Sequence, residues 1–145
     1  MGHTDPALPT FKGGTHGWDG TQWRKLPLLW GYSDRWYECG AWMGDGATEM
    51  GSTSAVPPGY IYILQKAAAM DLNSAPSSIC IRLYTDGGGY GMVGQDLSPV
   101  QGKYLIVDGP MVLKEGDYVT AVFGGTTNLD ELRLRVWGYK MAIAE

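Results

Sequence analysis

The 145-residue sequence has few of the residues on which disulfide frameworks and metal sites depend. It contains two cysteines, Cys39 and Cys80, and two histidines, His3 and His16. Two cysteines cannot form a disulfide framework, and their spacing does not show whether they meet. Because free cysteine is usually buried, we expect two reduced, partly buried thiols.

Two further absences bear on the class of partner. The net charge is −4, and no Lys/Arg cluster of the kind that duplex-binding domains carry is present, so we expect no nucleic-acid partner. No apolar run approaches the ~20 residues that span a bilayer. Residues 1–20 also lack the apolar segment of a signal peptide. The sequence therefore predicts a soluble protein with no membrane partner.

Catalytic signatures are missing as well. The sequence has no GxSxG, HExxH, CxxC or GxxxxGK[ST] motif. A glycosidase needs two carboxylates about 5–9 Å apart. The candidates mostly occupy turns, where Asp bonds the backbone; they are Glu38, Asp86, Asp96, Asp108 and Asp117. A metal site from His3, Asp5, His16 and Asp19 would have mobile ligands, which bind weakly. We expect no enzyme, no cofactor and no metal.

Glycine, by contrast, is abundant, at 22 of 145 residues, about twice the usual frequency. Such a composition suits tight turns between short strands. Period-2 alternation of apolar residues, bounded by turn signals, predicts most of the strands. They are expected at residues 35–43, 78–84, 90–93, 104–107, 111–113, 118–123 and 132–139. The sequence thus predicts an all-β fold, an antiparallel β-sandwich or jelly roll.

Two segments leave more than one interpretation open. Residues 60–70 begin with strand chemistry, but Lys66–Met70 would also suit a helix; we favour a strand. Residues 44–59 have glycines at one end and Pro57-Pro58-Gly59 at the other, which indicates a sixteen-residue loop. A loop of that length is typical of a functional or interface segment.

The composition changes abruptly near residue 22. Residues 1–22 contain prolines and glycines without strand or helix periodicity, so we interpret them as an extended N-terminal arm. Such a segment cannot bury enough surface to order itself, and gains order only against another surface. Residues 23–145 are predicted to form a single β-sandwich domain. The chain therefore consists of one domain with an arm.

Aromatic residues are concentrated in two places. Five of the six tryptophans lie between Trp18 and Trp42, and the last predicted strand alternates apolar residues with a second set of arginines and aromatics. Trp, Tyr and Arg are the residues most enriched at the centres of protein interfaces. The interface candidates are Trp18, Trp23, Trp30, Trp36, Arg133, Arg135, Trp137 and Tyr139. Alternatively, the N-terminal tryptophan segment covers the last strand, within one molecule or from a neighbouring subunit. A Trp/Tyr row could also stack sugars.

Two stretches resemble small tailed-bacteriophage virion proteins. Residues 19–26 (DGTQWRKL), continuing through Trp30–Trp36, are similar to the DGxxWxxLxxxxxGR pattern of those proteins. Residues 113–123 and 130–141 resemble their closing strand pair. Together these stretches cover about a third of the chain.

This resemblance implies a capsid decoration (cement) protein. Such a protein would bind the major capsid protein on the outside of the shell and neighbouring copies of itself, usually as a homotrimer, and its arm would reach adjacent subunits. It would be made in the host cytoplasm and reside in the virion. The alternative is a tail-fibre or receptor-binding jelly-roll head, or another carbohydrate-binding module, whose partner would be a glycan.

Overall fold

The structure, a computed structural model, describes residues 16–18, 23–25 and 34–143. The chain divides into two units, residues 1–32 with 144–145, and residues 33–143. In the first unit, β1 (His16–Trp18) pairs antiparallel with β2 (Trp23–Lys25). The arm predicted over residues 1–22 lies mostly outside the described residues, and its boundary with the domain at residue 23 stays a prediction.

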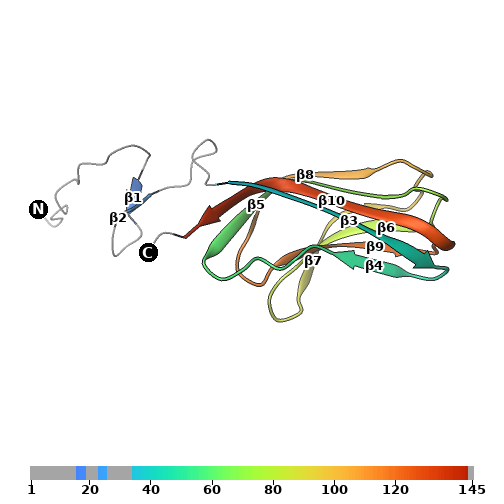
Figure 1. The fold of residues 1–145 in the computed structure, drawn as a ribbon, viewed down its shortest axis with the longest axis horizontal. Helices are drawn as coiled ribbons and strands as arrows, with labels where there is room; N and C mark the ends of the chain where they lie inside the picture. Colours follow the sequence, from blue (N-terminus) through green and yellow to red (C-terminus); the bar gives the residue numbers. More distant parts are fainter. Residues whose placement is uncertain (1–15, 19–22, 26–33, 144–145) are drawn as a thin grey trace, which may run out of the picture. The chain divides into compact units, whose positions relative to one another are not determined.

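The second unit is a sandwich of two four-stranded antiparallel sheets (Figure 1). The first sheet has the order β3 (Asp34–Asp45), β10 (Asn128–Ala142), β5 (Tyr60–Asp71), β8 (Leu105–Leu113). The second has the order β4 (Glu49–Ser52), β9 (Tyr118–Gly124), β6 (Ser78–Tyr84), β7 (Tyr90–Asp96). The predicted all-β class and antiparallel sandwich are confirmed.

The core lies between the two sheets and is built by alternate side chains of each strand. On β10 the inward set is Leu132, Leu134 and Val136, all buried. The second sheet contributes mainly aliphatic side chains and Phe123 to the same cluster. Full burial of one such side chain contributes about 1.5–3 kcal/mol, so these alternating rows hold the sheets together. The predicted alternation of the last strand is confirmed.

Residues 60–71 form a strand throughout, as favoured over a helix. β5 is an inner strand, paired with β10 on one side and β8 on the other. Its alanines, Ala67–Ala69, are almost fully buried. Two flanking ladders of backbone hydrogen bonds and burial on both faces override the helix propensity of alanine.

Two boundary predictions were wrong. Residues 44–59 are not a structureless loop, because β4 lies within them and pairs with β9. Here Gly51 leaves room for Trp42, since a Cβ at Gly51 would lie 2.0 Å from that ring. The strands expected at residues 104–107 and 111–113 are one strand, β8. Pro110 is tolerated because β8 is an edge strand whose register with β5 shifts at this point.

Candidate interaction faces

The described residues hold no cluster of three or more His, Cys, Asp or Glu side chains that could bind a metal. Of the four residues weighed as metal ligands, three lie outside the described residues, as does the side chain of His16. None of the described residues lies in a helix long and apolar enough to cross a membrane.

Of the carboxylates weighed as a catalytic pair, Asp96, Asp108 and Asp117 are bonded within the fold, and Asp86 lies in a turn. Asp117 accepts hydrogen bonds from the backbone N–H groups of Lys114 (3.0 Å) and Asp86 (3.4 Å). Asp96 accepts one from the Ser98 N–H (2.9 Å). The turn interpretation is therefore confirmed for Asp96 and Asp117. Asp108 instead forms an exposed ion pair with Lys66, at 3.3 Å.

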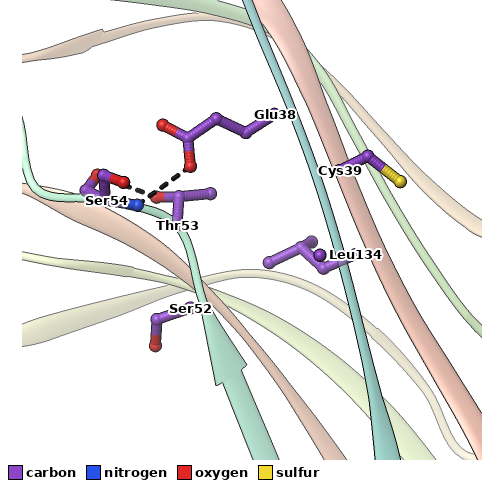
Figure 2. Close-up of a pocket in the computed structure, with 7 residues that line it drawn as sticks. Glu38, Cys39, Ser52, Thr53, Ser54 and Leu134 are labelled. Atoms are coloured by element: carbon purple, nitrogen blue, oxygen red, sulfur yellow. Dashed lines mark hydrogen bonds between the residues drawn. The ribbon is translucent and has the colours of Figure 1, made fainter.

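The fifth carboxylate, Glu38, lies at a cavity of about 390 Å³ between β3 and β4 (Figure 2). Its two oxygens accept hydrogen bonds from Trp36 Nε1 (3.2 Å) and the Ser54 N–H (2.9 Å). Cys39, the next residue on β3, lies across the strand from Glu38, as alternation along a strand requires. Because thiol and carboxylate point apart, they do not form a nucleophile–base pair.

The most prominent surface is the outer face of the first sheet. Arg133, Arg135, Trp137 and Tyr139 of β10 share this face, and each is partly exposed. Trp137 is paired with Tyr37 of β3 on one side and with Lys66 of β5 on the other. Tyr37 is 60% exposed, and Val112 of β8 is 62% exposed. We call this surface the tryptophan face: Tyr37, Val112, Arg133, Arg135, Trp137 and Tyr139.

The two arginines of the tryptophan face differ in their partners. Arg133 forms a 2.7 Å ion pair with Glu131, and this hydrogen bond raises the pKa of Arg133. The Arg135 guanidinium lies 5.8 Å from the centre of the Tyr104 ring. Its Nε is buried without a hydrogen-bond partner, and no carboxylate among the described residues pairs with it. Arg135 is thus a charge still open to a partner.

The eight predicted interface residues do not all lie on one surface of the structure. It brings the four of β10 together on one face. Trp18 and Trp23 are paired across β1 and β2, but their side chains lie outside the description, as does Trp30 altogether. For Trp36 the structure corrects the prediction of an interface residue, because its side chain is 1% exposed and belongs to the core. Its ring packs 4.9 Å from that of Tyr62, so it is not available to a partner.

A second aromatic surface covers the outer face of the second sheet, and the sequence interpretation missed it. Tyr118, Tyr84 and Tyr90 lie side by side in one row across β9, β6 and β7. The Tyr84 ring centre is 5.2 Å from each neighbour, parallel to Tyr118 within 2° and tilted 33° from Tyr90. In the next row Arg82 places its guanidinium 4.5 Å from the Tyr90 ring centre.

Two exposed methionines complete this surface, one on each side. Met50 of β4 and Met92 of β7 are 52% and 56% exposed, and Met92 pairs directly with Arg82. We call this surface the tyrosine face: Met50, Arg82, Tyr84, Tyr90, Met92 and Tyr118.

One sequence signal could have found part of the tyrosine face. A turn joins β6 to β7 and is closed by hydrogen bonds between Thr85 and Gly89. That turn sets Tyr84 directly opposite Tyr90. Tyr118, however, joins the row only through the pairing of β9 with β6, which spans more than thirty residues. No local pattern encodes such a pairing.

Each face also carries one cysteine, and both thiols are free. Cys39 is opposite Arg135 and is exposed, whereas Cys80 is opposite Val122 and is buried. The expectation of two reduced thiols agrees with the structure. The expectation that both are partly buried was wrong for Cys39, because it points outward from an edge strand.

Comparisons with known proteins give no family for this chain. No protein-family model matches it, and no curated protein matches it in sequence. One similar solved structure is a chain of Bacillus endospore appendages, described as a novel family of disulfide-linked pili. It has a TM-score of 0.43 and 12% identity, covering 77% of this chain and 88% of that chain.

Another similar structure is a chain of the infectious bursal disease virus Gx strain. Its TM-score is 0.33 and its identity 10%, covering 94% of this chain and 42% of that chain. Both similarities are too remote to carry an argument about function. That argument depends on the two faces themselves.

Proposed function

We propose that the protein is a structural component of a bacteriophage virion, a decoration (cement) protein without catalytic activity. It binds the major capsid protein on the outside of the shell and neighbouring copies of itself. The tryptophan face carries this proposal. It combines three aromatic rings, two guanidinium groups and the exposed side chain of Val112 on one sheet.

The composition of the tryptophan face favours a macromolecular partner. Side chains such as Tyr37 and Val112 are more than half exposed and lie on the same outer face as Trp137. Monomeric proteins rarely leave extended apolar patches uncovered. Burying them contributes about 25 cal/mol per Å² of apolar surface. Several copies on one shell would multiply such modest contacts through avidity.

The virion location and the homotrimer come from the sequence resemblance of residues 19–36 and 113–141, and they remain part of the proposal. So does the role of the arm, residues 1–22, in reaching neighbouring subunits. Ordering that arm costs roughly 1–2 kcal/mol per residue in backbone entropy, so it must gain contacts on assembly.

The proposal is tested by binding to particles that lack this protein, prepared from a virus with the gene deleted. Trp137→Ser should weaken co-sedimentation with these particles roughly 10-fold or more, as loss of an interface anchor does. Leu97→Ser is the matched control, because Leu97 is 70% exposed in the loop after β7 and belongs to neither face. Equal binding of the two variants would contradict the role of the tryptophan face.

The arm is tested in the same assay. Deletion of residues 1–22 should abolish or strongly reduce particle binding while the sandwich stays folded, as judged by circular dichroism. Unchanged binding would argue against a cement protein whose arm holds its neighbours.

A second candidate is a receptor-binding head that holds a glycan. The pairing of Trp137 with Tyr37 favours it, because neighbouring half-exposed rings can stack on sugars. A reproducible signal on a glycan array, lost in Trp137→Ala, would support this function over the first.

A further inference from the structure

The tyrosine face has the composition of a second docking surface, on the opposite sheet from the first. Among the outward-facing residues of β4, β9, β6 and β7, Arg82 is the one charged side chain. Around it lie the three tyrosine rings and the two exposed methionines. Tyrosine, methionine and arginine are all enriched at protein interfaces relative to the rest of a surface.

Arg82 is held in place, yet its charge has no counterpart. Its guanidinium lies over the Tyr90 ring, and Nη1 donates a long hydrogen bond of 3.5 Å to Tyr84 Oη. Its Nε is buried without a hydrogen-bond partner. No carboxylate in the described part of the chain forms an ion pair with it. A fixed, half-buried guanidinium is preorganised to bind a carboxylate through two parallel hydrogen bonds.

The ring geometry favours a protein over a saccharide. Sugars stack on open ring faces, but Tyr84 has Tyr118 on one side and Tyr90 on the other, each at 5.2 Å. One face of Tyr90 is covered by the Arg82 guanidinium. Beside these rings lie the exposed, flexible side chains of Met50 and Met92. These groups suit the irregular apolar surface of a protein.

Charge argues against a second copy of the chain as the occupant. A two-fold contact of this face with itself would place Arg82 near the Arg82 of the other copy. A head-to-tail contact would set it against the tryptophan face, where Arg135 is likewise unpaired with any described carboxylate. Both arrangements bring like charges together and leave them uncompensated.

We propose that the tyrosine face binds a second protein of the assembly, one that presents an Asp or Glu side chain to Arg82 within an apolar surface. The chain is then bivalent, with one docking surface on each sheet. This inference rests on the proposed function only in taking the partner to be part of the same particle.

The test uses the full-length protein and the particles that lack it. Arg82→Gln removes the charge, and Tyr90→Ser removes an exposed ring from an edge strand without touching the core. Each should weaken particle binding roughly 10-fold, and Arg82→Lys should fall between wild type and Arg82→Gln because it keeps the charge but loses the planar fork. Leu97→Ser should bind as wild type. Thermal unfolding checks that every variant is folded.

The outcomes separate this inference from the proposed function. If Trp137→Ser binds weakly while Tyr90→Ser and Arg82→Gln bind as wild type, the tyrosine-face proposal is overturned and the proposed function stands. If all three bind as wild type, both fail. If both single-face variants weaken binding and the Trp137→Ser/Tyr90→Ser double variant loses the product of the two factors, the faces act independently and bivalence is supported.

Two further measurements exclude the other occupants. Sedimentation velocity of the isolated protein should give the same oligomeric state for wild type and Arg82→Gln. An oligomer that dissociates in Arg82→Gln would identify a second copy as the occupant and overturn the proposal. Binding to sialylated or uronate-containing glycans that is lost in Arg82→Gln would overturn it in favour of an acidic saccharide.

Discussion

The two outer faces of the sandwich share one structural feature, an arginine placed over a tyrosine ring. They differ in how many strands supply their residues. On each, a guanidinium lies over a tyrosine ring, Arg135 over Tyr104 and Arg82 over Tyr90. In both arginines Nε is buried and unpaired among the described residues. Four of the six residues of the tryptophan face lie on a single fifteen-residue strand, β10, whereas the residues of the tyrosine face come from four strands held in register. A shared surface chemistry can therefore arise from a local pattern or from long-range pairing.

The largest expected difference separates two tryptophans of the first sheet, Trp36 and Trp137. Trp36 is in the core and Trp137 is on the outer face, so Trp36→Ala should destabilise the fold by about 3–5 kcal/mol. Trp137→Ala should cost about 1 kcal/mol or less, because its ring is already partly in water. Urea denaturation of both variants measures the difference. Equal losses would mean that Trp137 is a structural residue and not an interface residue.

A comparable contrast exists between glycines of the two sheets. A Cβ at Gly138 of β10 would lie 1.8 Å from the carbonyl oxygen of Ile63, which is backbone and cannot move aside. A Cβ at Gly91 of β7 would meet nothing within 4 Å. We expect Gly138→Ala to cost about 3 kcal/mol and Gly91→Ala to change stability by less than about 0.5 kcal/mol. Thermal or urea unfolding checks both, and a tolerated Gly138→Ala would show that β10 and β5 are not this closely packed.

A buried carboxyl pair lies at one end of the first sheet. Asp71 ends β5 and Asp130 lies in β10, and the Ser74 hydroxyl, in the segment leading to the second sheet, lies within hydrogen-bond distance of both carboxyl groups. Burial raises the pKa of Asp71 above its usual 3.8. Burial acts in the same direction on Asp130, but the hydrogen bonds that it accepts from Ser74 and Thr127 outweigh it and lower its pKa. Asp71 therefore keeps its proton to a higher pH than Asp130 does.

The pH dependence of stability follows from the directions of these two pKa shifts. The contribution of Asp71 to the stability of the fold is present below pH 3.8 and is lost as the pH rises through its raised pKa. That of Asp130 is present above pH 3.8 and is lost as the pH falls through its lowered pKa. Asp71→Asn should therefore gain stability relative to wild type as the pH rises from 4 to 8, roughly the range in which a raised carboxyl pKa acts.

Asp130→Asn is the matched variant. It should cost about 1–3 kcal/mol at neutral pH, because the Ser74 hydroxyl and the Thr127 N–H lose a charged acceptor that is itself buried. Urea denaturation between pH 4 and pH 8 compares the two. Parallel pH profiles for wild type and Asp71→Asn would contradict the raised pKa of Asp71.

The smallest expected effect concerns the two cysteines, one in each sheet, which differ in their access to solvent. Cys39 is exposed and Cys80 is buried. Alkylation of the native protein with iodoacetamide should therefore modify Cys39 and leave Cys80 unmodified until the protein unfolds, because access limits the reaction of a thiol. Mass spectrometry of tryptic peptides identifies the modified residue. Modification of Cys80 at the rate of Cys39 would show that the tyrosine face opens readily.

The sequence predicted the class of fold and the face of β10 because both depend on period-2 alternation within one strand. The sequence prediction failed where the two faces of a strand carry residues of similar hydrophobicity. On β3, Trp36 and Tyr37 are adjacent aromatics, and the inward set includes the charged Glu38. Hydrophobicity alone therefore does not show that Trp36 is in the core. β4 was missed because four residues, one of them glycine, carry too little pattern.

Side-chain footprinting with hydroxyl radicals tests the account most directly, by comparing the free protein with the protein in purified particles. The account predicts that oxidation of Trp137 on one face and of Tyr90 and Met92 on the other is strongly reduced in the particle, while Leu97 reacts equally in both states. Unchanged oxidation of Trp137, Tyr90 and Met92 in the particle would contradict the claim that the outer faces are docking surfaces.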